Sequence, residues 1–339
     1  MLFQRYSSVL QSWTAEGTPK ISLDAAGLVA LADLQVIAQR TAYTGTSALL
    51  DTFVLCPGLH RQQAAPDLNG GEYPAVAAMT SGYVFRVENP ATVLYLQKVG
   101  ITGHLTTLHV KRQELPHWTS HVLARFFTHQ NAVPLQTASY LIIPCLTIIV
   151  LTLLIVSGDW WGVFVISALM FARLCNVIVL RRRTDVGWKG AREPGVDGDL
   201  LVLLSQDRWV RIRGAVDDLK AVTSGQWLRD MTFVERSVTA CSTVLVYLDA
   251  ALASNMAQAG KVMLIVLLIL SAGLLAISNE KTDHLQMHGC VIKEDGQSPK
   301  KYGRRLEMAR ELIEEMKRDD WAVRLGLING SPEKGPIIA

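Results

Sequence analysis

Residues 138–157, ASYLIIPCLTIIVLTLLIVS, constrain this chain most, because they form an apolar run of 20 residues without a charge. A helix of that length rises about 30 Å, which matches the hydrocarbon core of a bilayer. Residues 161–180 form a second run that is apolar apart from Arg173; it follows the Gly158-Asp159 turn, has tryptophans suited to the membrane interface at its start and stops at Arg181, Arg182 and Arg183. These runs predict a transmembrane helical hairpin.

A second apolar block indicates another pair of spans. Residues 261–278 are an unambiguous span with a charge only at Lys261, where the run begins, whereas residues 237–253 are only just long enough and contain Asp249. Lys and Arg number nine in 1–137, eleven in 181–236 and eleven in 279–339, and the turns 158–160 and 254–260 contain none. Because basic segments stay on the cytoplasmic side, we expect four spans, with both termini cytoplasmic.

The fold class expected is therefore a membrane α-helical protein, with four transmembrane helices as two hairpins and a mixed α/β cytoplasmic domain. The segments expected are an N-terminal cytoplasmic α/β segment (1–134), hairpin 1 (135–183), a cytoplasmic β-hairpin and helix (184–235), hairpin 2 (236–279) and a C-terminal cytoplasmic segment with an amphipathic helix (280–339).

Composition supports a membrane protein and excludes one class of partner. Hydrophobic residues make up 50% of the chain and charged residues only 19%, and the mean hydropathy is +0.24. A net charge of +3 without a basic patch interleaved with aromatics argues against nucleic-acid binding. The five cysteines are scattered, contain no CxxC pair and suit apolar packing.

The polar sections predict ordinary secondary structure. Residues 22–40 are typical of a short helix, and the runs 82–89, 92–99 and 104–112 carry the β-branched and aromatic residues of strands. Residues 303–328 place apolar side chains mostly on one helical stripe, which predicts a helix that docks on the soluble core or on a partner.

Residues 199–230 predict strand, turn, strand and helix, with one apolar sheet face. Asp217 and Asp218 are adjacent on the predicted helix, so they point about 100° apart and suit a helix start better than one proton or metal. A second set lies on the polar strand face and suits either solvent or an anionic membrane surface or partner: Arg208, Arg211 and Arg213.

Two histidine pairs at i and i+4 raise the alternative of a metal site at the membrane face. His117 and His121 precede the first span, and His284 and His288 follow the last one. On helices, each pair would share one face, as metal ligation needs. The pairs resemble in outline the boxes of membrane di-iron hydroxylases and desaturases, but the HxxHH boxes are absent. We expect no cofactor, with iron or zinc as the alternative.

Polar residues inside the predicted spans raise the alternative of an ion pathway through an oligomer. Arg173, Asn176 and Asp249 would line such a pore. By helical rise, Arg173 lies about 10 Å from the cytoplasmic boundary and Asp249 about 6 Å from the opposite one. Their depths exclude a direct pair, and we expect the two charges to snorkel toward opposite faces.

One longer stretch carries a family resemblance. The run EPGVDGDLLVLLSQDRWVRIRGAVDDLKAVTSGQWLRD (193–230), with VYLDAALASN, SAGLLAISNE, LQMHG and RDDWAVRLG further on, resembles a group of uncharacterised membrane proteins of filamentous fungi. The resemblance covers residues 185–328. It implies a multi-span membrane protein of a eukaryotic host and carries no catalytic residue.

The sequence thus favours an integral membrane protein that acts as a non-enzymatic docking or scaffold component at the cytoplasmic face. The partners expected are the lipid bilayer, other proteins and further copies of the chain in a homo-oligomer. The metalloenzyme and the oligomeric ion pathway stay open as alternatives.

Overall fold

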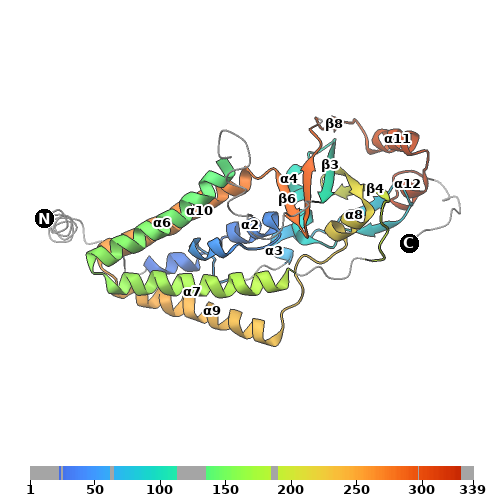
Figure 1. The fold of residues 1–339 in the computed structure, drawn as a ribbon. Coiled ribbons are helices and arrows are strands. Elements are labelled where there is room, and N and C mark those ends of the chain that lie inside the picture. Colours follow the sequence, from blue (N-terminus) through green and yellow to red (C-terminus); the bar gives the residue numbers. More distant parts are fainter. Residues whose placement is uncertain are drawn as a thin grey trace.

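The computed structural model describes residue 23 and residues 26–61, 65–112, 135–184, 190–296 and 298–329. Two bodies lie end to end in it, a bundle of long helices and a mixed sheet with shorter helices (Figure 1). We call the end of the bundle that meets the sheet the sheet-side end, and the opposite end the far end.

Four helices in the described residues are long and apolar enough to cross a membrane, which confirms the predicted number. They are α6 (Leu135–Ser157), α7 (Trp160–Arg183), α9 (Phe233–Leu252) and α10 (Gln258–Glu280). The doubtful third span is a full-length helix, which begins with a capping box between Thr232 and Glu235. The chain is therefore a membrane protein by the length and composition of its helices.

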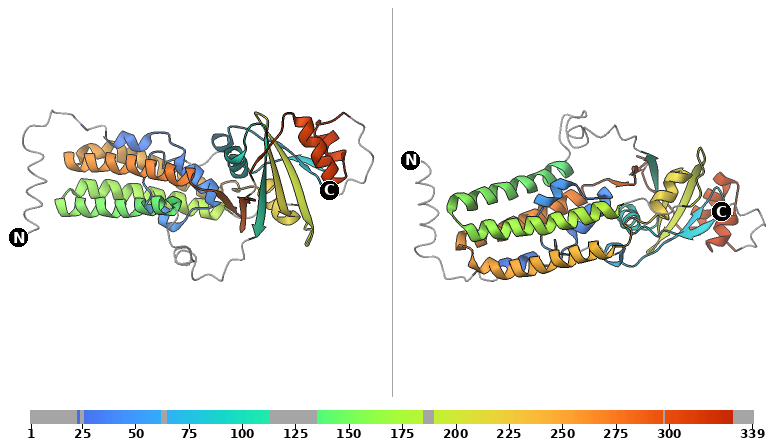
Figure 2. Two further views of the ribbon diagram at one scale, coloured as in Figure 1. Left: turned by 90° about the horizontal axis from the view of Figure 1, so that it is seen from above. Right: turned by 60° about the horizontal axis from the view of Figure 1, so that its bottom comes forward.

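The long helices pack as two pairs that differ from their order in the chain. The most extensive contacts join α6 to α10 and α7 to α9, and those between α6 and α7 are fewer. The helices run side by side in both views of Figure 2. That each successive pair forms a transmembrane hairpin remains a prediction.

The space between these pairs holds an N-terminal segment that we expected in a cytoplasmic α/β domain. Its elements are the 3₁₀ helix η1 (Ala26–Leu31), the helix α2 (Val36–Thr44) and the 3₁₀ helix η2 (Leu49–Phe53). Helix η1 packs against α9 and α10, and η2 packs against α7 and α6. The single helix expected over 22–40 is wrong, because the described part is broken between η1 and α2.

The sheet collects strands from three distant sections of the chain. Its order is β2-β1-β4-β5-β3-β7-β6, and β8 pairs with β3 beside this path. All pairs are antiparallel except β3 with β5. The strands are β1 (Ala75–Ala78), β2 (Val84–Arg86), β3 (His104–Arg112), β4 (Asp197–Leu204), β5 (Arg208–Ala215), β6 (His284–Met287), β7 (Cys290–Glu294) and β8 (Lys300–Lys301).

The predicted hairpin and helix of residues 199–230 are confirmed. Strands β4 and β5 pair from Asp197 with Ala215 to Leu204 with Arg208. Helix α8 (Val216–Thr223) follows directly, with Asp217 and Asp218 in its first turn. Carboxylates there favour the positive end of the helix dipole.

One predicted strand is wrong. Residues 92–99 belong to helix α4 (Pro90–Val99), although their β-branched and aromatic residues favour a strand. The Asn89 side chain accepts hydrogen bonds from the backbone N–H groups of Ala91 and Thr92, and Pro90 occupies the first helical position. This strong helix start decides the conformation over side-chain propensity.

Helices cover both faces of the sheet, so the hairpin does not have the single apolar face that we expected. Helices α4 and α8 share a core with one face, and on the other face Leu201 and Trp209 pack with Met308 and Trp321. Helices α11 (Arg305–Met316) and α12 (Asp320–Arg324) lie on the side away from the bundle (Figure 2). They replace the single continuous helix predicted over 303–328. Helix α11 ends before Lys317, whose backbone is in the left-handed conformation.

The sheet body is bound firmly to the bundle. The Lys98 ammonium of α4 donates hydrogen bonds to the carbonyl oxygens of Asn279, Glu280 and Thr282 at 2.7, 2.7 and 2.9 Å. These are carbonyls at the end of α10, which a cation stabilises. Burial lowers the pKa of Lys98, and the nearby Glu280 opposes that shift. The position of α10 therefore fixes the position of α4.

Candidate functional site

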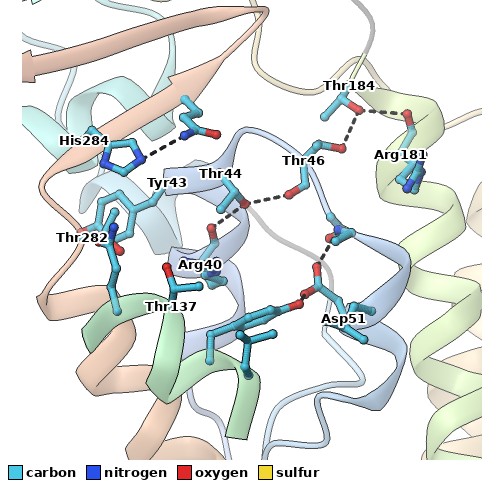
Figure 3. A pocket seen from close by; sticks show the side chains of 17 residues that line it. Arg40, Tyr43, Thr44, Thr46, Asp51, Thr137, Arg181, Thr184, Thr282 and His284 are labelled. Carbon is cyan, nitrogen blue, oxygen red and sulfur yellow. Dashed lines mark hydrogen bonds between the residues drawn. The ribbon is translucent and has the colours of Figure 1, made fainter. Parts of the chain in front are cut away.

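A cavity of about 710 Å³ lies at the junction of the two bodies (Figure 3). Its walls come from α2 and η2, from the first turns of α6, from the last turn of α7, and from the chain between α10 and β6. It sits at the sheet-side end of the long helices, where the apolar bundle meets the more polar sheet body. We call it the junction pocket.

The charged groups of the junction pocket are mainly basic. Arg40 and Arg181 line it, and among the described residues of the lining Asp51 is the only acidic one. Figure 3 shows Arg40 on α2 and Arg181 on α7, on different walls. The Arg40 guanidinium lies 4.7 Å from the centre of the Tyr140 ring, a cation–π contact that holds it over the pocket wall.

The carboxylate of Asp51 is already engaged by the wall. It accepts hydrogen bonds from the Tyr140 hydroxyl at 2.5 Å and from the backbone N–H of Ala48 at 2.8 Å. These contacts tie η2 to α6 and cap the start of η2. Asp51 therefore has a structural role in the pocket wall. With ordinary ionisation, the described lining side chains carry a net charge of about +1.

Polar and apolar groups divide the lining. Hydroxyl groups gather near Arg181, where the Thr46 and Thr184 side-chain oxygens lie 3.2 Å apart. Leu50, Leu141 and the Tyr140 ring supply apolar surface from η2 and α6. The pocket thus offers a polar, positively charged part and an apolar part, which is the pattern that an amphipathic ligand needs.

Two polar atoms of lining residues have no hydrogen-bond partner among the described residues. They are the Ser47 hydroxyl oxygen and the side-chain carbonyl oxygen of Gln136. The Ser47 residue is only 1% exposed. Buried polar groups are almost always satisfied by protein, water or ligand, so these two atoms offer hydrogen-bonding positions for a water or a polar ligand in the pocket.

The histidines do not form the helical pair that the metal alternative needs. His284 lies on strand β6, where its Nδ1 donates to Asp283 at 2.7 Å and its Nε2 accepts from the Gln286 amide at 3.0 Å. His288 lies in the next turn, with Nε2 3.2 Å from the Gln226 carbonyl oxygen. Burial acts to raise the pKa of Asp283, but the hydrogen bond and the charge of His284, together with a backbone hydrogen bond and the Lys293 ammonium, lower it overall.

The other predicted pair, His117 and His121, lies outside the described residues. Within the part of the chain that the structure describes, no three His, Cys, Asp or Glu side chains are placed to hold one metal ion. The prediction of a helical i, i+4 pair at His284 and His288 is wrong, because a hairpin forms there instead.

The predicted arginine surface is also different in the structure. Arg211 is buried, and its guanidinium pairs with Asp199 at 2.6 Å and with Glu315 of α11 at 2.7 Å. Arg213 contacts the same two carboxylates, and Arg208 donates to the Gln97 carbonyl oxygen. The three side chains do not form one exposed surface, because α11 covers part of the strand face that carries them.

The intramembrane polar residues serve the N-terminal segment. Arg173 and Asn176 of α7 donate to the carbonyl oxygens of Asp51 at 3.3 Å and Leu59 at 2.9 Å, and both side chains are buried rather than snorkelling. Asp249 of α9 is 2% exposed, and its Oδ1 has no partner among the described residues. None of Arg173, Asn176 and Asp249 lines the junction pocket.

Sequence reasoning missed the junction pocket. Its basic residues are Arg40, within a stretch expected to be an ordinary helix, and Arg181, which we interpreted only as the end of a span. Ser47 and Gln136 carry no motif. The single usable signal was the run of arginines in the last turn of α7, because it marks the interface at which the other walls meet.

No protein-family model matches this sequence, and comparison with curated proteins and with solved structures gives no significant match.

Proposed function

We propose that this membrane protein binds an amphipathic ligand with a negatively charged head group in the junction pocket, as a non-enzymatic component at the membrane face. One observation carries the proposal. The pocket has arginines on two walls, apolar side chains beside them, and two unsatisfied polar atoms, and it opens at the end of four membrane-length helices.

The arginines favour an anionic head group. A guanidinium presents several donors in a planar fork, which suits phosphate and carboxylate oxygens. The Ser47 hydroxyl is a donor as well as an acceptor, so it can add a hydrogen bond to such a group.

The apolar part of the lining favours a lipid over a free anion. Ligand pockets of about 300–1,000 Å³ suit molecules of drug size, and the junction pocket falls in this range. Leu50 and Leu141 would contact an acyl chain, and the bilayer around α6 and α7 supplies such molecules directly. The ligand class that we propose is therefore an anionic phospholipid.

The two rival functions receive no support from the described residues. A metalloenzyme would need His284 and His288 on one face of a helix, and they lie on a strand and in a turn. A pore would need Arg173 and Asn176 to face a cavity, and they bind backbone carbonyl groups instead. Docking of other proteins remains compatible with lipid binding and would use the sheet body.

The test compares lipid binding by the full-length protein and a double variant, Arg40→Gln with Arg181→Gln. Nanodiscs or mixed micelles would present phosphatidic acid or phosphatidylcholine, and native mass spectrometry would count the bound lipid. We expect the double variant to bind phosphatidic acid at least about tenfold more weakly, which corresponds to about 1.4 kcal/mol.

The matched control is Arg305→Gln, because Arg305 is an exposed arginine on α11 whose partner Asp207 lies far from the pocket. It should bind phosphatidic acid like the unchanged protein. Thermal unfolding in detergent would verify that all variants fold. Equal binding by the double variant, or equal binding of phosphatidylcholine by the unchanged protein, would refute the proposal. Competition by inorganic phosphate alone would indicate a soluble anion instead of a lipid.

A further inference from the structure

The described N-terminal segment begins at the far end of the bundle. Gly27 of η1 packs so closely on α9 that a Cβ added to it would lie 2.3 Å from the Ala250 carbonyl oxygen and 2.8 Å from the Ala253 Cβ. Ala253 starts the short 3₁₀ helix η3 (Ala253–Asn255), which joins α9 to α10. That connection is at the end of the bundle remote from the sheet (Figure 1).

The same segment reaches the sheet-side end a few residues later. The side-chain amide of Asn279, in the last turn of α10, donates to the Val36 carbonyl oxygen at 2.8 Å. Helix α2, which begins at Val36, then packs against α10, β6 and α4. Residues 26–44 therefore contact both ends of the bundle.

The length of chain between these contacts fits a crossing. A 3₁₀ helix rises about 2 Å per residue and extended chain about 3.3 Å, so residues 27–36 can advance at most roughly 25 Å along the bundle. The turn in which the Leu34 N–H donates to the Ala32 carbonyl oxygen shortens this distance, which still covers much of a hydrocarbon core of about 30 Å. Figure 2 shows η1 and α2, in dark blue, among the long helices and along their direction.

Apolar side chains of the segment face outward at this depth. Leu28 of η1 is 58% exposed and Leu49 of η2 is 59% exposed, although both helices pack against the membrane-length helices. In a bilayer these leucines would contact lipid. Asp33 and Arg61 are also exposed, but they form an ion pair with each other. Asp33 lies within about 10 Å of Val36 along the chain, so the ion pair is within reach of the membrane interface at the sheet-side end.

The broken backbone has the internal partners that lipid requires. Non-helical chain is tolerated at membrane depth only where protein satisfies its polar groups. The Ala30 carbonyl oxygen accepts from the Gly58 N–H at 3.1 Å, the Val36 carbonyl from Asn279, and the Leu59 carbonyl from Asn176. The turn at Gly58 and the helices α7 and α10 thus supply donors to carbonyl groups of the irregular segment.

We propose that residues 26–44 form a fifth, discontinuous membrane crossing, so that residue 23 and the sheet body lie on opposite faces of the membrane. Residues 45–61 then enter the bundle through η2 and return to the same face, as a re-entrant segment. The number of crossings becomes odd, which replaces the prediction that all polar sections share one compartment. This inference does not depend on lipid binding in the junction pocket.

The test places single cysteines in sealed vesicles of known orientation. Leu23→Cys reports the start of the segment, and Ser205→Cys reports the exposed turn between β4 and β5, in a background with the exposed Cys145 and Cys241 changed to alanine. A membrane-impermeant maleimide should label the two introduced thiols from opposite sides. Labelling of both from the same side would overturn the proposal.

A second measurement tests whether lipid surrounds the crossing segment itself. It does not use the Leu23→Cys variant, so it remains valid if that variant folds poorly. A nitroxide at Leu28→Cys should relax more with oxygen than with a water-soluble nickel complex, because lipid surrounds it. The matched control is Leu306→Cys, on helix α11 of the sheet body, which should show the reverse preference. Preference for the nickel complex at position 28 would overturn the proposal.

Discussion

Two buried arginines show how differently the sheet body and the bundle satisfy charge. Arg211 in the sheet body pairs with the carboxylates of Asp199 and Glu315. Arg173 in the bundle donates to the backbone carbonyl oxygen of Asp51. Near water, side chains satisfy each other, because the backbone of the strands is already paired in the sheet. In the bundle, side chains satisfy the backbone of a segment that consists of short helices and irregular chain, whose carbonyl groups are not all paired within it.

Several further side chains in the bundle repeat the second pattern. They are Thr147, which donates to the Phe53 carbonyl oxygen, Thr243, which donates to His60, and Asn279, which donates to Val36. All three accepting carbonyls belong to residues 26–61. The comparison therefore teaches that these polar residues of the long helices hold an irregular segment, rather than line a pore.

The largest effect expected is at Arg211. Arg211→Met would leave Asp199 buried without its main cation, and loss of one partner of a buried ion pair costs about 3–5 kcal/mol. We expect about 3 kcal/mol, the lower end of that range, since Arg213 still contacts Asp199. Thermal or urea unfolding in detergent would measure it.

The control for Arg211 is Arg208→Met, at the other end of the same strand, where the guanidinium contacts only carbonyl and hydroxyl oxygens near the surface. It should cost about 1 kcal/mol or less. An equal cost for the two variants would show that the sheet body does not depend on its buried ion pairs.

A smaller effect is expected at Asn176. Asn176→Leu would remove the donor to the Leu59 carbonyl oxygen, and leaving a buried acceptor unsatisfied costs about 1–3 kcal/mol. The matched control is Ile178→Leu, since Ile178 faces outward on the same helix. Thermal unfolding in detergent, monitored by fluorescence, would compare the stability of the two variants. Unchanged stability of the Asn176 variant would contradict the role that we assign to polar side chains of the bundle.

The smallest effect expected is the pH dependence of Glu315. Its hydrogen bond from Arg211 lowers its pKa, against an ordinary value of 4.5. The stabilisation is therefore fully present above pH 4.5 and is lost as the pH falls through the lower folded-state pKa. Because Glu315 is almost half exposed, the effect should stay below about 1 kcal/mol.

Hydrogen exchange of α11 between pH 3 and pH 6 would measure this dependence, and Glu315→Gln should remove the part that comes from this residue. Glu314→Gln, at an exposed position next to it, is the control. An acid dependence that persists unchanged in the Glu315 variant would assign it to another carboxylate.

Sequence reasoning predicted the parts of the fold that local pattern determines. The four long helices follow from long apolar runs with few charges, and the β4–β5 hairpin with α8 follows from alternation and a turn. Residues 92–99 show its limit, since the Asn89 cap and Pro90 outweigh strand propensity. Propensity averages over contexts, whereas a cap acts at one position.

The course of residues 26–61 was not predictable from local pattern. No continuous apolar run marks this segment, and its partners, such as Asn176 and Asn279, lie more than a hundred residues away. The junction pocket depends on the same segment, because Arg40 and Ser47 reach it only through that course. Long-range backbone contacts of this kind leave no periodic signal in a single sequence.

The pairing of α6 with α10 has a consequence for how the chain is made. About 100 residues separate the end of α6 from the start of α10, which takes roughly 5–20 s at ordinary rates of translation. During that interval α6 lacks its main packing partner, α10. Strand β3 likewise lacks its antiparallel partner β7, which is synthesised later still. A nascent chain that stalls after α9 therefore has a bundle without α10 and a sheet without β7. We expect membrane quality control to recognise such a chain.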